Sequence, residues 1–133
     1  MMLMKRRDFL KLGAAAGSMA ALHGCAAGGN KASGHVVVVG GGYGGATLAK
    51  YLRMWSEGGV DVTLVEPNAQ FVSCPISNLV VGGSKTIADV TVSYDNLVKR
   101  HGVKLVKDTA VAGDPDKRTV TLASGQVLPY DRL

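Results

Sequence analysis

The strongest constraint on this chain is a run of glycines that directly follows a short apolar segment. Residues 35–39 read His-Val-Val-Val-Val, a β-branched run typical of a strand buried on both faces of a parallel sheet. Residues 40–45 read Gly-Gly-Gly-Tyr-Gly-Gly and contain the pattern G-x-G-x-x-G. Residues 46–55 then have the apolar spacing of a helix, and residues 60–65 form a second apolar run that ends at Glu66. This order favours a dinucleotide-binding βαβ unit over a simple glycine-rich turn.

Each glycine of the pattern has its own physical role. Gly40 permits the tight turn from strand to helix, Gly42 leaves room for a pyrophosphate, and Gly45 allows the helix to pack closely on the strand. The helix start adds unpaired N–H groups and a partial positive charge, which suit phosphates. Glu66 lies 21 residues after Gly45, where a carboxylate can accept hydrogen bonds from both ribose hydroxyls. Because this carboxylate would repel a 2′-phosphate, the residues disfavour NADP and leave FAD and NAD open.

The first 34 residues are predicted to be an export signal with a flexible lead-in, separate from the folded part. Residues 5–11 read Lys-Arg-Arg-Asp-Phe-Leu-Lys, which resembles the twin-arginine pattern, and residues 12–22 are apolar and uncharged. That run is too short for a transmembrane helix, which needs about 20 residues. We therefore expect a periplasmic protein. The segment ending at Cys25 resembles a lipobox, so a lipid anchor at Cys25 and simple cleavage one or two residues later both remain open.

The charge distribution argues against nucleic-acid binding. The chain has a net charge of +5 at pH 7, but residues 1–25 account for +3 of it, which leaves +2 for the remainder. The high isoelectric point therefore belongs mostly to the signal, and no basic patch with interleaved aromatic residues follows it. His23, His35 and His101 are scattered, which gives little support for a metal site. About 100 residues remain after the signal, enough for one small core.

A second distinctive segment, residues 72–83, contains Cys74 next to Pro75. Since proline suits the first position of a helix, we expect a short helix that begins at Pro75, with Cys74 at its N-cap. Amides at a helix start stabilise a thiolate, which makes Cys74 a candidate reactive cysteine. A buried, inert cysteine is the alternative that the residues leave open. Residues 86–89 are expected to be a simple connection.

Residues 94–133 predict the last strand of a parallel sheet, followed by antiparallel strands. Residues 94–101 are expected to form a helix that stops at Gly102, and residues 103–106 a third parallel strand. Right-handed crossovers then give the sheet order 3-2-1. Turn sequences divide the following residues into three short strands of an antiparallel meander, at 109–112, 118–122 and 126–128. Residues 130–133 resemble the start of another strand of the main sheet.

Several segments closely resemble the flavoprotein subunit of flavocytochrome c sulfide dehydrogenase: the twin-arginine signal, VVVVGGGYGGATLAKYL, VTLVEPN, FVSCPISNLVVGG, the meander beginning DTAVAGDPDK, and YDRL. The resemblance runs from about residue 5 to residue 133 and covers the N-terminal quarter to third of the family protein. This family belongs to the flavoproteins with two dinucleotide-binding domains, together with sulfide:quinone oxidoreductases and type II NADH dehydrogenases. The implied fold class is α/β, a Rossmann-like FAD-binding domain with a parallel sheet and a β-meander. Residues 35–133 would be the incomplete N-terminal part of this FAD/NAD(P)-binding domain.

The resemblance also implies FAD as the cofactor and assigns residues to it. The pyrophosphate would lie against the glycine loop, and the adenosine ribose beside Glu66. Val111 would meet the adenine through its backbone. Cys74 matches the family cysteine that bonds to the flavin 8α-methyl carbon, so the FAD would be attached covalently. The implied cofactor-binding residues are Gly40, Gly42, Tyr43, Gly44, Gly45, Glu66, Pro67, Asn68, Cys74 and Val111.

By the same resemblance, the protein would oxidise sulfide and pass electrons through FAD to a c-type cytochrome subunit. The family's redox-active disulfide would lie beyond Leu133, and the sequence has no C-x-x-C-H haem motif, so the haem would belong to the partner. The 133 residues alone are therefore expected to bind flavin without turning over sulfide. Two other interpretations stay open: a quinone-reducing or NADH-oxidising flavoenzyme of the same superfamily, and a nucleotide-binding module without catalysis. The residues also leave open whether the substrate is sulfide, a thiol or a polysulfide.

Overall fold

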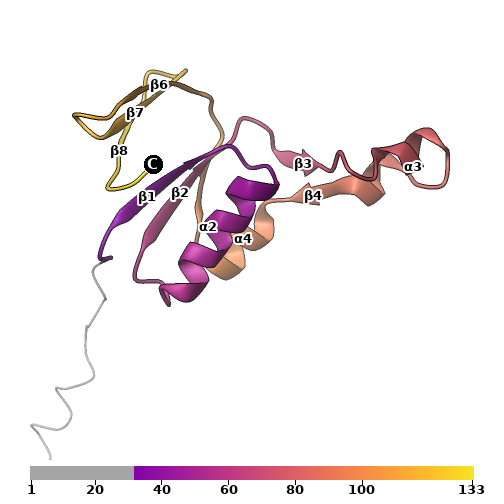
Figure 1. Cartoon of the computed structure of the whole chain (residues 1–133), viewed down its shortest axis with the longest axis horizontal. Coiled ribbons are helices and arrows are strands. Elements are labelled where there is room, and N and C mark those ends of the chain that lie inside the picture. Colours follow the sequence, from indigo (N-terminus) through magenta and orange to yellow (C-terminus); the bar gives the residue numbers. More distant parts are fainter. Residues whose placement is uncertain (1–31) are drawn as a thin grey trace, which may run out of the picture. The chain divides into compact units, whose positions relative to one another are not determined.

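A computed structural model describes residues 32–133 of this chain (Figure 1). The predicted export signal, its apolar run and the lipidation site at Cys25 lie outside the described residues. The central element is a three-stranded parallel sheet in the order β1-β2-β5, formed by β1 (His35–Val39), β2 (Asp61–Val65) and β5 (Lys104–Val106). This order confirms the predicted 3-2-1 arrangement. The third strand begins one residue later than expected.

Two helices accompany the sheet, α2 (Tyr43–Trp55) and α4 (Asp95–His101). Helix α2 packs against β1 and β2 and contacts α4. It begins three residues earlier than predicted, since its first turn already includes Gly44 and Gly45. Helix α4 ends at His101 and is capped by Gly102, whose φ of 65° lies in the left-handed region, as predicted for a glycine that stops a helix. No helix in the described part is both long and apolar enough to cross a membrane.

Both faces of the sheet are buried, which explains the unbroken β-branched run of β1. Val38 belongs to a core cluster on the helix side, which also contains Ala49, Val62, Leu64, Tyr94 and Val103. Val37 belongs to a second cluster, with Val65, Val120, Leu122 and Leu128 from the last strands. Successive residues of β1 therefore point into different cores. This arrangement confirms the prediction of a strand covered on both sides.

The predicted antiparallel meander is confirmed. It consists of β6 (Ala110–Asp114), β7 (Thr119–Leu122) and β8 (Val127–Pro129), paired in that order. Val111 occupies a bulge of β6, because the register with β7 skips from Ala110 to Ala112. After β8 the chain returns to the main sheet, where Arg132 forms a parallel bridge with Val36. The predicted return of residues 130–133 to the sheet is therefore confirmed.

A second antiparallel pair lies between β2 and α4 and was not predicted. Strands β3 (Gln70–Val72) and β4 (Thr91–Ser93) pair with each other, and the residues between them include α3 (Ser77–Val81) and a 3₁₀ helix (Ile87–Val90). The expected simple connection at residues 86–89 is thus largely a helical turn. We call residues 70–93 the arm; Figure 1 draws it in pink to orange.

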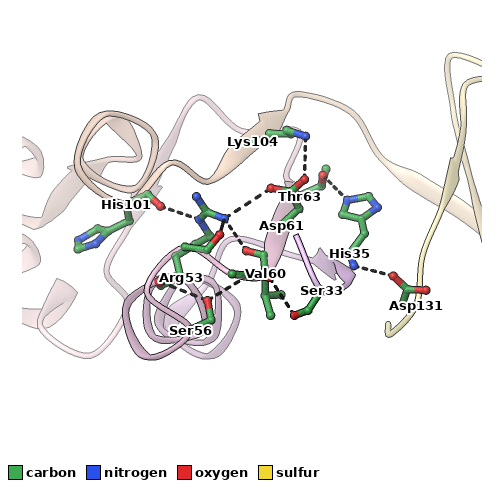
Figure 2. Close-up of polar contacts among 12 residues, drawn as sticks. Ser33, His35, Arg53, Ser56, Val60, Asp61, Thr63, His101, Lys104 and Asp131 are labelled. Atoms are coloured by element: carbon green, nitrogen blue, oxygen red, sulfur yellow. Dashed lines mark hydrogen bonds and ion pairs between the residues drawn. The ribbon is translucent and has the colours of Figure 1, made fainter. Parts of the chain in front are cut away.

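Arg53, near the end of α2, joins the helix to the sheet and to α4 (Figure 2). Its Nε donates to the carbonyl of His101 at 2.9 Å, and its Nη1 donates to the carbonyl of Val60 at 2.5 Å. Nη1 also lies 3.5 Å from Asp61 Oδ1, and the other oxygen of Asp61 lies 3.6 Å from Lys104 Nζ. One guanidinium therefore connects α2, the start of β2 and the end of α4.

Candidate dinucleotide-binding site

The glycine turn after β1 has the geometry that its sequence predicted. Gly40 has a φ of 95°, in the left-handed region that favours glycine, and its N–H donates to the carbonyl of Val65 at 2.9 Å. A Cβ atom added to Gly45 would overlap the carbonyl oxygen of Gly40 and lie 3.3 Å from a methyl carbon of Val38. The close packing predicted at Gly45 is therefore confirmed.

The outer side of the same turn is open. A Cβ atom added at Gly42 or at Gly44 would have no heavy atom within 4 Å. Gly42 is the N-cap of α2, and the first helical N–H that bonds back to the turn is that of Ala46, to the carbonyl of Gly42 at 2.9 Å. The amides of the first turn therefore stand at the positive end of the helix dipole beside open backbone, an arrangement that suits an anionic group.

Glu66 follows β2 directly and turns its side chain toward the glycine turn. It is buried, with 8% of its surface exposed. Its Oε2 accepts the N–H of Gly41 at 2.7 Å, and its Oε1 accepts both the backbone N–H and the side-chain Nδ2 of Asn68, at 2.9 and 2.7 Å. Since each carboxylate oxygen can accept more than one hydrogen bond, Oε2 can still accept another donor.

The hydrogen bonds of Glu66 also decide its charge. Burial acts to raise the pKa of this carboxyl, but the N–H groups that Gly41 and Asn68 donate to it together outweigh burial and lower the pKa below its usual value. Glu66 is therefore ionised at neutral pH. The predicted acid at the end of the second strand is present as a fixed negative charge beside the turn.

Tyr94 completes the environment of the turn and was missed by the sequence analysis. It is 5% exposed, and its hydroxyl donates to the carbonyl oxygen of Gly41 at 3.0 Å. Burial raises the pKa of Tyr94, and the charge of Glu66 raises it further, so the hydroxyl keeps its proton at neutral pH. No local sequence signal identifies this contact, because the two residues are 53 positions apart.

Tyr43 links the glycine turn to the arm. Its hydroxyl forms a short hydrogen bond with the hydroxyl of Ser73, which is buried. Its ring packs edge-on against Phe71, with the centroids 4.7 Å apart and the planes at 76°. Ser73 in turn donates its backbone N–H to the carbonyl of Val90 at 2.8 Å. The residue immediately before Cys74 is thus held against the glycine loop.

The environment predicted for Cys74 is wrong. Helix α3 begins at Ser77 with Ile76 as its N-cap, so Cys74 lies two residues before the N-cap and does not occupy that position. Instead, the carbonyl of Cys74 accepts the N–H of Ser77 at 2.9 Å, which makes Pro75 the second residue of a tight turn. The alternative of a buried cysteine is wrong as well, because Cys74 is an exposed, free thiol.

Two cavities share the walls formed by Gly42, Phe71 and Tyr94. The first has a volume of about 450 Å³ and is also bordered by Glu66 and Asn68. The second, of about 430 Å³, extends along α2 and the arm, with Tyr43, Ser73 and Ile76 among its lining residues. Together the two cavities bring four of the predicted residues into one region. The remaining six do not line either cavity: Gly40, Gly44, Gly45, Pro67, Cys74 and Val111.

A parallel strand, a glycine turn, a helix with open first-turn amides and a buried carboxylate after the next strand define a Rossmann-like dinucleotide-binding domain. Comparison with known protein families identifies which family with such a domain the chain matches. Residues 34–133 match the family described as pyridine nucleotide-disulphide oxidoreductase. The chain belongs to this family. Residues 3–23 match the signal sequence of the twin-arginine translocation pathway, so the chain carries a signal for export across the membrane.

Individual relatives are similar over different parts of the chain. A stretch of 45 residues, 34% of the chain, is 62% identical to the sulfide dehydrogenase [flavocytochrome c] flavoprotein chain of Chlorobaculum thiosulfatiphilum and covers 92% of that sequence. Over 99 residues, 74% of the chain, it is 32% identical to the sulfide-quinone reductase of Aquifex aeolicus and covers 23% of it. The solved structure of the sulfide:quinone oxidoreductase from Aquifex aeolicus superposes with a TM-score of 0.68 at 32% identity, over 73% of this chain and 22% of that one. The chain therefore spans less than a quarter of the length of these Aquifex proteins.

Proposed function

We propose that this chain is the N-terminal part of an exported FAD-dependent oxidoreductase that oxidises sulfide and passes the electrons to a c-type cytochrome subunit. The observation that carries the proposal is the ionised Glu66, held beside an open glycine turn at the start of a helix. The 62% identity to a sulfide dehydrogenase flavoprotein chain supports the choice of substrate and partner. Bound FAD would supply an acceptor for two electrons. Residues 35–133 would form part of its binding domain.

The residues of the turn fit a dinucleotide. The open positions at Gly42 and Gly44 leave the backbone free for a pyrophosphate, with Gly40, Tyr43 and Gly45 shaping the loop around it. Glu66 would accept hydrogen bonds from the adenosine ribose, and its negative charge disfavours a 2′-phosphate.

Residues beside the turn would complete the adenosine end. Asn68 orients Glu66 through its two hydrogen bonds, and Pro67 would flank the ribose. Val111 would present its backbone to the adenine. The bulge of β6 supports this role, because it takes Val111 out of the regular pairing with β7.

Cys74 is the proposed attachment point of the flavin: its Sγ would bond to the 8α-methyl carbon in place of one methyl hydrogen. That hydrogen and the thiol hydrogen would pass to the flavin ring as two electrons and two protons, which would leave the flavin reduced. Two observations support this attachment. The thiol is exposed and free. Its neighbour Ser73 is hydrogen-bonded to Tyr43 of the glycine loop, so a ligand that extends from the loop past this contact would come close to the cysteine segment. The proposal does not rest on a helix N-cap at Cys74, since α3 begins at Ser77 with Ile76 as its N-cap.

The proposed location is the periplasm. The twin-arginine signal supports it, and export in a folded state suits a protein that acquires its FAD in the cytoplasm. Cys25 would be either the lipidated N-terminus or a residue lost with the signal. Mass spectrometry of the mature N-terminus distinguishes these two products.

Acid precipitation tests the flavin proposal. The protein is expressed from its complete open reading frame with FAD available, precipitated with acid, and the pellet examined for flavin fluorescence. We expect a fluorescent pellet from the unmodified protein and from Ser84→Ala, an exposed control in the arm, and none from Cys74→Ser. Flavin found wholly in the supernatant would remove the attachment role of Cys74. A full-length protein without any flavin would leave only a nucleotide-binding module.

A sulfide:quinone oxidoreductase is the second candidate function, favoured by the 32% identity to the Aquifex reductase over 74% of the chain. The two candidates differ in electron acceptor. Sulfide-dependent reduction is therefore measured with a c-type cytochrome and, separately, with a soluble quinone. Turnover with the cytochrome alone supports the proposed function, and turnover with the quinone alone supports the second candidate.

A further inference from the structure

Tyr94 lies directly against the backbone of the glycine turn. A Cβ atom added at Gly41 would come within 2.5 Å of the hydroxyl oxygen of Tyr94 and within 2.7 Å of its Cζ. The phenol therefore fills the space that a side chain at residue 41 would need. This contact explains why residue 41, which the G-x-G-x-x-G pattern leaves free, is itself a glycine.

The two polar groups of Gly41 are held by different partners. Its N–H donates to Glu66 Oε2 at 2.7 Å, which fixes the peptide between Gly40 and Gly41. Its carbonyl accepts the Tyr94 hydroxyl at 3.0 Å, which fixes the peptide between Gly41 and Gly42. Two consecutive peptide planes of the turn are thus oriented by two buried side chains from different parts of the chain.

The orientation of the second peptide determines where the N–H of Gly42 points. In a trans peptide the C=O and the N–H point in opposite directions. Because Tyr94 holds the carbonyl of Gly41, the N–H of Gly42 is turned away from the phenol. Within residues 32–133 this N–H has no hydrogen-bond acceptor, and the backbone at Gly42 is open on the side where its Cβ would stand.

We propose that Tyr94 is a positioning residue for phosphate recognition: it presets the Gly41–Gly42 peptide so that the N–H of Gly42 donates to the pyrophosphate of the bound dinucleotide. This inference rests on the proposed dinucleotide function. In this arrangement the Tyr94 hydroxyl would act through the carbonyl of Gly41 and would make no hydrogen bond of its own to the pyrophosphate. Its contribution is to keep the binding-competent orientation populated before the ligand arrives, which removes the penalty of turning the peptide on binding.

The test compares two ligands in two proteins. Both proteins carry Cys74→Ser, so that flavin can be removed completely, and one also carries Tyr94→Phe. Calorimetry measures the affinity for ADP, which has the pyrophosphate, and an NMR titration measures the affinity for adenosine, which lacks it. We expect Tyr94→Phe to weaken ADP binding by about three- to tenfold and to leave adenosine binding unchanged. Tyr130→Phe, the same chemical change in the second core cluster, should affect neither ligand.

Other outcomes would overturn the inference. Equal weakening of ADP and adenosine binding would mean that Tyr94 only supports the structure. Unchanged ADP binding would mean that the Gly41–Gly42 peptide keeps its orientation without the Tyr94 hydroxyl. A reference protein that binds neither ligand would overturn the dinucleotide function itself, on which this inference rests.

Gly41→Ala provides a second variant should Tyr94→Phe fold poorly. Its backbone φ does not lie in the left-handed region, so alanine is compatible with the conformation, but the new Cβ would displace the phenol. The inference requires the same selective loss of ADP affinity in this variant. An ADP affinity equal to that of the reference protein would contradict it.

Discussion

The N–H of Gly41 donates to Oε2 of Glu66 at 2.7 Å, so the acid at the end of one strand and the turn at the end of its neighbour form a single unit. These two residues are 25 positions apart, and the parallel pairing of β1 with β2 brings them together. The carboxylate is therefore already oriented in the protein alone. A ligand that uses both the turn and the acid meets groups whose relative positions are fixed in advance.

Replacement of Glu66 should change the pH dependence of stability. The pKa of this carboxyl is lowered in the folded state from its usual value of 4.5. Its contribution is therefore fully present above pH 4.5 and is lost as the pH falls through the lowered folded-state pKa. We expect Glu66→Gln to reduce the free energy of unfolding at pH 7 by about 1–3 kcal/mol, because the buried N–H donors of Gly41 and Asn68 lose their charged acceptor. The loss should shrink as the pH falls below 4.5.

Urea unfolding of the Glu66→Gln variant at pH 7 and at several lower pH values checks this expectation. Glu57→Gln is the matched control, since Glu57 is exposed and carries the same chemical change. A loss of stability in Glu66→Gln that stays constant down to the most acidic pH would contradict a role for the ionised carboxylate.

Gly45→Ala should strongly destabilise the protein. The added Cβ would overlap the carbonyl oxygen of Gly40, which is backbone and cannot swing aside, so we expect a loss of about 3 kcal/mol. Gly44→Ala is the natural comparison, because its Cβ would meet nothing within 4 Å and the residue lies in the same helix. Its stability should be unchanged or raised by about 0.5 kcal/mol. Thermal unfolding of the pair measures the difference, and similar values for both variants would refute the close approach.

Tyr43→Phe should loosen the start of the arm. The variant keeps the ring packed against Phe71 and removes the hydroxyl that pairs with buried Ser73. The lost hydrogen bond is worth about 1 kcal/mol, which corresponds to about fivefold faster amide exchange at Ser73 if local opening controls it. Hydrogen exchange followed by NMR gives the rate. Tyr51→Phe, whose ring packs on Trp55 within α2, should leave the exchange of Ser73 unchanged.

Arg53→Lys should cost about 1–3 kcal/mol of stability, although it preserves the charge. Lysine cannot reproduce the planar fork that reaches the carbonyls of His101 and Val60 at the same time. Chemical denaturation measures the loss, and Arg100→Lys on the exposed surface of α4 should stay within about 0.5 kcal/mol. Equal effects of the two changes would show that the network in Figure 2 contributes little.

The sequence predicted the sheet and its glycine turn well because their signals are local. Strand, turn and acid follow one another within residues 35–66, and each has a distinct residue pattern. The predicted start of α2 was three residues too late, because Gly44 and Gly45 are intrinsically poor helix formers. In the fold the missing side chain of Gly45 permits the first turn of the helix to lie against the strand, so tertiary packing overrides intrinsic propensity.

The features that were missed depend on contacts over long separations. Strands β3 and β4 have three residues each and show no alternation that marks them as partners. The contact of Tyr94 with Gly41 spans 53 residues. The environment of Cys74 was predicted wrongly for a different reason. Pro75 suits both the first turn of a helix and the second position of a β-turn. The hydrogen bond from the N–H of Ser77 to the carbonyl of Cys74 shows that the β-turn forms.

The bond between Asp131 Oδ2 and the backbone N–H of His35 joins residues that are 96 positions apart (Figure 2). A growing chain leaves the ribosome from its N-terminus, so β1 emerges long before this acceptor and the bridging Arg132 are available. Completion of the first strand is therefore a late event of biosynthesis. The export signal at residues 3–23 emerges from the ribosome before the fold behind it can close.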